Sequence, residues 1–270
     1  MNYGRMRVLC VCNLKGGVGK TTTVVNLAGI LATEYGKKVL VIDNDQQGNA
    51  SQFFGVFDPD NRGTAEVLCM EENIRDVIIH QPNNSNLAIL PANMNLAAAN
   101  RQLMVESGSM PKEIRLREAL CEVAEEYDFA IIDNGPNLDY SFDAAITAAN
   151  DYLIPVKIDK YAFYGIDFIR ERARAIKQYW NPDINFLGCL VTMQHVTNKL
   201  EREGVEWLAN GETALHAPCK ILDTKIKYSP RINDTTFSSE LITTLSNRSM
   251  AAKNYKELAA EYLESIKVAK

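Results

Sequence analysis

The sequence has little of what would direct a chain into or across a membrane. Residues 1–6 contain no apolar stretch, and the first apolar run, residues 8–12, is far shorter than a bilayer span. No later run reaches that length. We therefore expect no export signal and no membrane partner, and we predict a cytoplasmic protein.

Cysteine is also scarce, with six residues in 270 and no Cys-x-x-Cys pair. Paired cysteines at that spacing are typical ligands of zinc ribbons and iron–sulfur sites, so both are disfavoured. Cys10, Cys12 and Cys189 lie inside apolar runs, where a small buried thiol is the ordinary interpretation. These observations predict a reduced, cytosolic protein.

There is no excess of glycine, proline or positive charge. The 15 glycines and 9 prolines are too few for a low-complexity chain. The 29 Lys and Arg against 34 Asp and Glu give a formal charge of −5, which excludes attraction of the whole molecule to nucleic acid but leaves room for a local basic patch. No repeat or linker is visible, so we expect a single domain over residues 1–270.

Short apolar runs alternate with stretches of helical periodicity. The apolar runs show no polar alternation, which is typical of parallel strands covered on both faces, and they span residues 7–12, 39–42, 129–132, 152–156 and 186–191. Helices are expected over residues 21–35, 114–127, 163–179 and about 249–267. This order predicts an α/β fold, a doubly wound, mostly parallel sheet with helices on both faces. Residues 210–249 are the least regular.

A glycine-rich loop lies between the first predicted strand and the first helix. Glycines 16, 17 and 19 let backbone N–H groups approach phosphate oxygens, and the helix that begins near Lys20 adds the positive end of its dipole. Lys20 can reach β- and γ-phosphates, and the Thr21 hydroxyl can ligate Mg²⁺. The alternative is a tight turn without a ligand. The Gly-Lys-Thr triplet favours a nucleotide site formed by Lys15, Gly16, Gly17, Val18, Gly19, Lys20, Thr21 and Thr22.

The loop carries a second lysine, Lys15, while Leu14 stands where the ordinary phosphate loop has its first glycine. Binding a nucleotide in the same subunit does not require this cation. Its physical use would be to project outward and neutralise phosphate charge across a dimer interface, as an arginine finger does in trans. The chain here resembles the ParA/Soj branch of the deviant Walker A P-loop ATPases, whose hallmark is this lysine. The resemblance implies ATP, Mg²⁺, an ATP-dependent homodimer and a catalytic role for Lys15.

Two carboxylates follow the second predicted strand. Asp43 and Asp45 emerge at the ligand edge of an open α/β sheet, where one can serve Mg²⁺ and the other the attacking water. The alternative is a solvated acidic turn. The segment is similar to the family motif Asp-x-Asp-Pro-Gln-Gly-Asn, with Gln46 in place of the proline. Because the second aspartate of that motif orients the hydrolytic water, the resemblance implies a catalytic Asp45 and a metal-binding Asp43.

Asp133 follows the apolar run 129–132, the Walker B arrangement, in which the aspartate holds Mg²⁺ directly or through water. Thr21, Asp43 and Asp133 are therefore the expected metal residues. The family usually continues with Pro-Pro-Ser, whereas this chain has Asn-Gly-Pro-Asn at residues 134–137.

The resemblance extends over nearly the whole chain. Residues 190–193 are similar to the family strand whose end touches adenine, which implies Met193 as a nucleotide contact. His195 follows in a segment that departs from the family sequence. We expect it near the nucleotide without a catalytic role, because Asp45 already supplies the group that orients water.

A basic patch occupies residues 220–231, where Lys220, Lys225, Lys227 and Arg231 oppose only Asp223. Such a patch suits contact with DNA phosphates of any sequence, and a dimer doubles it; an ordinary solvated face is the alternative. Arg231 also matches a family arginine, so Lys225, Lys227 and Arg231 are the expected DNA contacts. A further cluster on the predicted helix 163–179 comprises Arg170, Arg172, Arg174 and Lys177.

These features together predict a ParA-like partition ATPase. Mg-ATP would drive dimerisation and nonspecific DNA binding on the nucleoid, and hydrolysis with a ParB-like partner would reset the monomer. The alternative is a MinD-like membrane or cell-pole positioning ATPase. Such relatives carry a basic amphipathic segment after the last helix, whereas this sequence reaches Lys270 without one. A redox ATPase of the nitrogenase iron-protein type would need paired cysteines, which this spacing does not supply.

Overall fold

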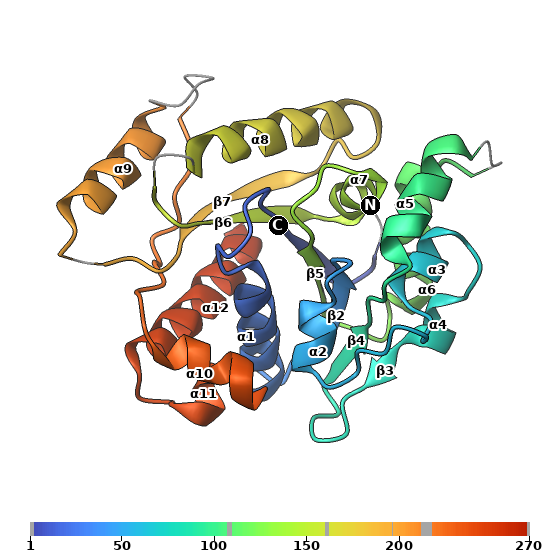
Figure 1. The fold of residues 1–270 in the computed structure, drawn as a ribbon, viewed down its shortest axis with the longest axis horizontal. Coiled ribbons are helices and arrows are strands. Elements are labelled where there is room, and N and C mark those ends of the chain that lie inside the picture. The colour runs from blue at the N-terminus through green and yellow to red at the C-terminus, as the bar shows by residue number, and fades with distance from the viewer. Residues whose placement is uncertain (1–2, 107–109, 160–161, 196, 212–217, 269–270) are drawn as a thin grey trace.

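A seven-stranded sheet forms the centre of the molecule (Figure 1). The computed structural model describes residues 3–106, 110–159, 162–195, 197–211 and 218–268. The strand order is β3-β4-β2-β5-β1-β6-β7, and every neighbouring pair is parallel except β3 and β4. The strands are β1 (Arg7–Val11), β2 (Val39–Asn44), β3 (Ile79–His80), β4 (Leu87–Leu90), β5 (Phe129–Asn134), β6 (Asp151–Val156) and β7 (Asn185–Val191). The predicted α/β fold with a mostly parallel sheet is confirmed.

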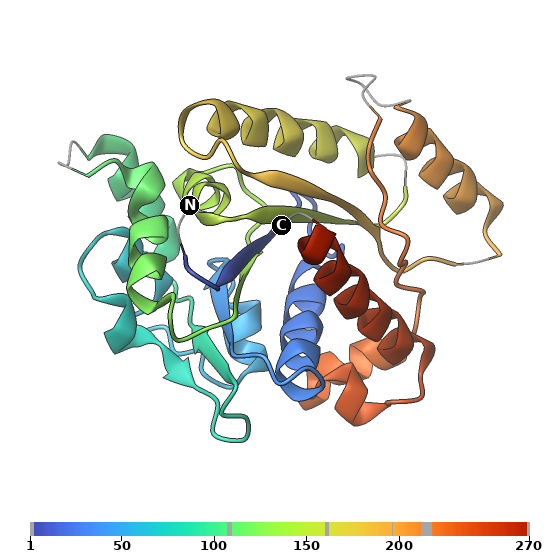
Figure 2. The ribbon, with the colours of Figure 1, turned by 180° about the vertical axis from the view of Figure 1, so that it is seen from behind.

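Side chains of the central strands alternate between two cores, one on each face of the sheet. In β1, Val8 and Cys10 belong to the first core, with α5 (Leu96–Val105), α6 (Arg115–Val123), α7 (Tyr140–Ala148) and α8 (Ala162–Tyr179). Leu9 and Val11 belong to the second, with α1 (Lys20–Thr33) and α12 (Met250–Val268). Figures 1 and 2 show these two helical layers from opposite sides. Burial on both faces explains why the strands are continuously apolar.

The remaining helices are short connections or lie toward the C-terminal half of the chain. They are α2 (Asn49–Phe53), α3 (Thr64–Leu68), α4 (Ile74–Val77), the 3-10 turn η1 (Lys112–Ile114), α9 (Lys199–Asn210), α10 (Arg231–Ser238) and α11 (Ile242–Leu245). The helix predicted over residues 114–127 ends at Val123, because the chain turns there to enter β5 and Tyr127 packs into the core. None of the helices in the described ranges has both the length and the apolar content needed to cross a bilayer.

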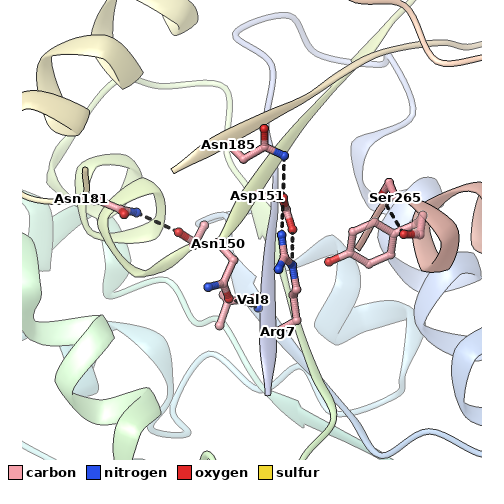
Figure 3. A network of polar contacts seen from close by, with 9 residues as sticks. Arg7, Val8, Asn150, Asp151, Asn181, Asn185 and Ser265 are labelled. Atoms are coloured by element: carbon pink, nitrogen blue, oxygen red, sulfur yellow. Dashed lines mark hydrogen bonds and ion pairs between the residues drawn. The ribbon is translucent and has the colours of Figure 1, made fainter. Parts of the chain in front are cut away.

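Polar contacts hold the first residues of three strands together (Figure 3). Arg7 Nε and Nη2 donate to the two carboxylate oxygens of Asp151 at 2.7 and 2.9 Å, and Asn185 Nδ2 donates to Asp151 Oδ1 at 2.8 Å. These residues begin β1, β6 and β7. Because parallel strands that start together also end at one edge, their carboxyl ends bring the connecting loops to the same side of the sheet.

Candidate nucleotide-binding site

The glycine-rich loop joins β1 to α1 at the carboxyl edge of the sheet. Gly17 and Gly19 have φ of 69° and 87°, a conformation that favours glycine, and Gly19 is the N-cap of α1. Within the described chain no side chain caps this helix, so its first N–H groups remain for another acceptor. A Cβ at Gly16 or Gly17 would meet no atom within 4 Å. The loop therefore borders open space at the positive end of a helix, which suits an anion.

A pocket of about 520 Å³ opens beside this loop. The volume falls in the range of small-ligand sites. Its walls come from the loop and α1, from the segment after β2, from the turn after β5 and from α10 with its end. They comprise Gly16, Gly17, Gly19, Lys20, Thr21, Thr22, Val25, Asp45, Gln47, Asn49, Gln52, Phe53, Pro136, Thr235, Thr236 and Ser239. The pocket thus extends from a phosphate-type loop to a hydroxyl-rich wall.

Lys20 is a buried cation in the wall of this pocket. Lys20 is 7% exposed, and its Nζ donates to the Lys15 carbonyl at 3.2 Å. Burial lowers the pKa of its ammonium, while the nearby carboxylates of Asp133 and Asp45 act in the opposite direction. A desolvated ammonium beside open space attracts phosphate oxygens more strongly than it would in water.

Lys15 lies in the same loop but does not line the pocket. Its N–H donates to Asn13 Oδ1 at 2.9 Å, and Asn13 in turn donates to the Pro155 carbonyl at 2.7 Å. Its ammonium forms an ion pair with Asp159, just after β6. The backbone of Lys15 is thus anchored, while its half-exposed side chain is held by its own subunit outside the pocket.

Asp43 and Asp133 face each other as register partners at the ends of β2 and β5. Both strands continue two residues beyond the apolar runs, because Asp43, Asn44, Asp133 and Asn134 keep the backbone ladder. The Asp43 carboxylate accepts hydrogen bonds from the Ser51 N–H and hydroxyl, both at 2.7 Å, and from the Asp45 N–H at 3.2 Å. Burial nevertheless raises the pKa of Asp43 to about 6.

Asp133 has a different environment. Neither of its carboxylate oxygens has a hydrogen-bond partner in the described part of the chain, and the side chain is fully buried. Burial raises its pKa well above the ordinary value, Asp43 adds to this rise, and the Thr21 hydroxyl opposes it. A buried carboxylate without a partner is costly unless a cation joins it. Oxygen atoms of Asp133 and Thr21 are the hard ligands that Mg²⁺ prefers, so these residues fit the ion, whereas Ser51 already donates twice to Oδ2 of Asp43.

Asp45 lies in the wall of the pocket and is 6% exposed. Its Oδ1 accepts the Gln47 N–H at 3.0 Å. Gly135 packs against it, and a Cβ there would lie 3.4 Å from Asp45 Cγ. The carboxylate is therefore fixed by the backbone at the rim of the open space, as a group that orients a water molecule needs to be.

Met193 and His195 do not line the pocket. Met193 has φ of 53°, and the preceding Thr192 donates its hydroxyl to the carbonyl of buried Val18 at 2.8 Å, so this strand end supports the loop from behind. His195 contacts Glu201 at 3.0 Å and stacks on Tyr228. Thr235, Thr236 and Ser239 line the pocket instead. Sequence reasoning missed them, and their only signal was a hydroxyl-rich stretch inside the irregular region.

The predicted DNA contacts differ in exposure. The Arg231 side chain is 66% exposed at the start of α10 and pairs with Asp234 at 3.1 Å. Lys225 donates to the Asp223 carbonyl at 3.4 Å, and Lys227 Nζ lies 4.0 Å from Met250 Sδ. Much of the cluster on α8 is engaged within the fold, because Arg172 pairs with Asp143 and Lys177 donates to the Ile184 carbonyl. Arg231 is thus better placed for a surface role than the α8 cluster.

Known proteins match this chain along nearly all of its length. Residues 6–186 fit the family model described as AAA domain. Sporulation initiation inhibitor protein Soj of Bacillus subtilis is 32% identical over 256 residues, 94% of this chain and 97% of the relative. Chromosome-partitioning ATPase Soj of Thermus thermophilus is 31% identical over 269 residues and 100% of both chains. The crystal structure of cobyrinic acid a,c-diamide synthase from Mycobacterium smegmatis, with bound ATP analog and magnesium, has a TM-score of 0.82 at 28% identity, covering 98% of this chain and 97% of that one.

Proposed function

The chain belongs to the ParA/Soj family of P-loop ATPases, and from this premise we propose that it partitions DNA through a cycle of ATP binding, dimerisation and hydrolysis. As a family member it is an ATPase that uses ATP and Mg²⁺. The diamide synthase shares the fold but is named for a different reaction, and fold alone does not choose between activities. Partition is supported by the names of the relatives matched over their full length.

The observation that carries the proposal is the set of charges at the loop. Lys20 and the uncapped start of α1 would bind the β- and γ-phosphates, and Thr21 and Asp133 would hold Mg²⁺. When bound, the ion neutralises charge on the phosphate oxygens and orients the leaving group. In this arrangement Asp43 would not ligate Mg²⁺ directly. It would accept the N–H groups of Asp45 and Ser51 and so hold the segment after β2 beside the metal.

Hydrolysis would depend on Asp45 and Lys15. Asp45, fixed at the rim of the pocket, would orient the attacking water. Lys15 would leave Asp159 and reach the phosphates bound by the partner subunit of a two-fold dimer, where its cation offsets charge in the transition state. Release of Asp159 on dimerisation would make turnover depend on assembly, and a ParB-like partner would accelerate it.

DNA binding is proposed for the surface of α10. This helix carries Arg231 at its start and Thr235 and Thr236 in the wall of the pocket, so one short element joins the two sites. A nucleotide that contacts α10 would therefore set the position of Arg231. Because phosphate contacts read no sequence, binding would be nonspecific and would place the ATP-bound protein on the nucleoid in the cytoplasm.

The experiment that tests this function separates DNA from membrane. The protein is incubated with ATP or ADP and Mg²⁺, together with either DNA of unrelated sequences or liposomes of anionic phospholipid, and bound protein is measured by co-sedimentation and flotation. We expect ATP-dependent binding to every DNA and none to liposomes. Flotation with liposomes in ATP, without DNA binding, would favour the MinD-like function instead.

A further inference from the structure

The two buried thiols of Cys189 and Cys219 lie in contact beside the edge strand β7, in the core between the sheet and α8. Their Sγ atoms are 3.0 Å apart, and neither cysteine is in a disulfide. Cys189 is fully buried in β7, and Cys219 is 3% exposed in the segment that follows Pro218. A disulfide requires an S–S separation of about 2.05 Å, so the sulfurs need to approach by only about 1 Å.

The backbone around this pair is already joined. The Cys189 N–H donates to the Lys220 carbonyl at 2.7 Å, and the Leu222 N–H donates to the Cys189 carbonyl at 3.0 Å. Further along, the Ile226 N–H donates to the Val191 carbonyl at 2.8 Å. Residues 219–228 thus cover the free edge of β7, the last strand of the sheet, and lead directly into α10.

We propose that Cys189 and Cys219 are an oxidation site whose disulfide fastens residues 219–228 to β7. This inference uses no part of the proposed function. The reaction is a two-electron oxidation by a peroxide. The Cys219 thiolate attacks one peroxide oxygen and becomes a sulfenic acid, and the other oxygen leaves as water after protonation. The Cys189 sulfur then attacks Cys219 Sγ, loses its proton, and the sulfenic oxygen leaves as a second water.

The surroundings make Cys219 the attacking partner. The contact with Cys189 lowers the pKa of Cys219 against the effect of burial, and the guanidinium of Arg170 lowers it further, while Asp167 opposes. Arg170 Nη2 donates to the Pro218 carbonyl at 3.1 Å, which keeps its charge beside the pair. Burial raises the pKa of Cys189, so that thiol remains protonated until the sulfenic acid forms. A thiolate with an adjacent resolving thiol is typical of cysteines that form disulfides on oxidation.

The test uses the full-length protein and hydrogen peroxide. After treatment and removal of peroxide by catalase, the chain is unfolded in an alkylating agent, digested with trypsin and examined by mass spectrometry. We expect a cross-link between peptides 178–199 and 203–220, lighter by two hydrogen atoms than their sum and reversed by a thiol reductant. The thermal midpoint of the oxidised protein should exceed that of the reduced protein, because the bond constrains the unfolded chain.

Variants separate this pair from the other cysteines. Cys219→Ser should lose both the cross-link and the peroxide-dependent rise in thermal midpoint. Cys121→Ser is the matched control, since Cys121 is exposed on α6, and it should retain both. Full alkylation of Cys189 and Cys219 at a peroxide concentration that oxidises Cys121 would overturn the proposal. A cross-link between other cysteines, or sulfinic acid at Cys219 without a cross-link, would overturn it equally.

Discussion

At the scale of single residues, the site is defined by charges that the fold has removed from water. Lys20, Asp43, Asp45 and Asp133 are each at most 7% exposed, and of the three carboxylates only Asp133 lacks hydrogen-bond partners for both oxygens among the described residues. Burial of this kind is costly, and groups so placed cluster where a charged ligand binds. Lys20, Asp45 and Asp43 each give a separate prediction.

Lys20→Ala should abolish ATP binding, because the β- and γ-phosphates lose the buried cation in the wall of the pocket. Nucleotide affinity is measured by titration with a fluorescent ATP analogue. Lys253→Ala, an exposed lysine on α12, is the control and should bind normally. ATP binding by Lys20→Ala at wild-type affinity would show that the phosphates lie elsewhere.

Asp45→Ala should bind ATP and dimerise but hydrolyse it slowly. Loss of a positioned group that orients water costs on the order of 10²- to 10⁴-fold in rate. Turnover is followed by phosphate release under saturating ATP, with Asp58→Ala on the exposed loop after α2 as control. Turnover close to that of the wild type would assign the water to another residue, and Asp43 would be tested next.

Asp43 makes stability depend on pH. Its pKa is about 6 in the folded chain against an ordinary 3.8, so between these values the folded state binds more protons than the unfolded state. The free energy of unfolding therefore falls as pH rises through this window, by up to about 3 kcal/mol. Urea unfolding at roughly pH 4.5 and pH 7, on either side of the folded-state pKa, should show a smaller fall for Asp43→Asn than for the wild type. Equal falls in the two proteins would mean that Asp43 does not titrate in this range.

At the scale of elements, the carboxyl edge of the sheet could be predicted and the far wall of the pocket could not. The strand–loop–helix order around Lys20 and the acids after β2 and β5 are local patterns, and the structure brings them together because parallel strands end at one edge. Thr235, Thr236 and Ser239 reach the pocket through packing of α10 and α11 near α1, such as the Ile242 N–H on Asn26 Oδ1 at 2.8 Å. Their sequence separation of more than 200 residues leaves no periodic signal. The ion pair between Lys15 and Asp159 could not be predicted either, because the two residues are far apart in the sequence and no local motif links them.

Lys15→Ala should retain ATP binding but lose dimerisation and turnover, because its cation acts on the partner subunit. Sedimentation velocity with ATP and Mg²⁺ measures the dimer. Asp159→Asn is the matched variant, since it removes the carboxylate that holds Lys15 in its own subunit, and it should dimerise at lower ATP concentration. A Lys15→Ala protein that dimerises and hydrolyses like the wild type would refute the role in trans.

At the scale of the whole molecule, a chain of net charge −5 is proposed to bind a polyanion through one surface. The charge of the whole molecule opposes the encounter, so affinity must come from the patch around Arg231 and its doubling in a dimer. Domain-wide composition gave no sign of this surface, whereas the local sequence did. The Arg231 guanidinium at the start of α10 is exposed, so its predicted contact with DNA can be tested directly by substitution.

Arg231→Glu should weaken binding about equally on any DNA sequence. Each lost phosphate contact reduces the slope of log affinity against log salt by about 0.9, so a dimer that loses two contacts loses about 1.8. Affinity is measured at several salt concentrations with a slowly hydrolysed ATP analogue. Arg75→Glu, which makes the same charge change on α4, should leave the slope unchanged. An unchanged slope for Arg231→Glu in intact dimers would remove this residue from the DNA surface.

The most direct test of ATP-controlled DNA binding follows the mass of the protein bound to DNA. Asp45→Ala, which should hold ATP without consuming it, is mixed with a labelled DNA duplex of arbitrary sequence and Mg²⁺, and sedimentation velocity is recorded with ATP and with ADP. For Asp45→Ala we predict DNA-bound dimers in ATP and no binding in ADP. A double variant that carries Lys20→Ala together with Asp45→Ala should bind no DNA in either nucleotide. DNA binding of equal strength in ATP, in ADP and in the Lys20→Ala protein would contradict a cycle in which the nucleotide governs DNA binding.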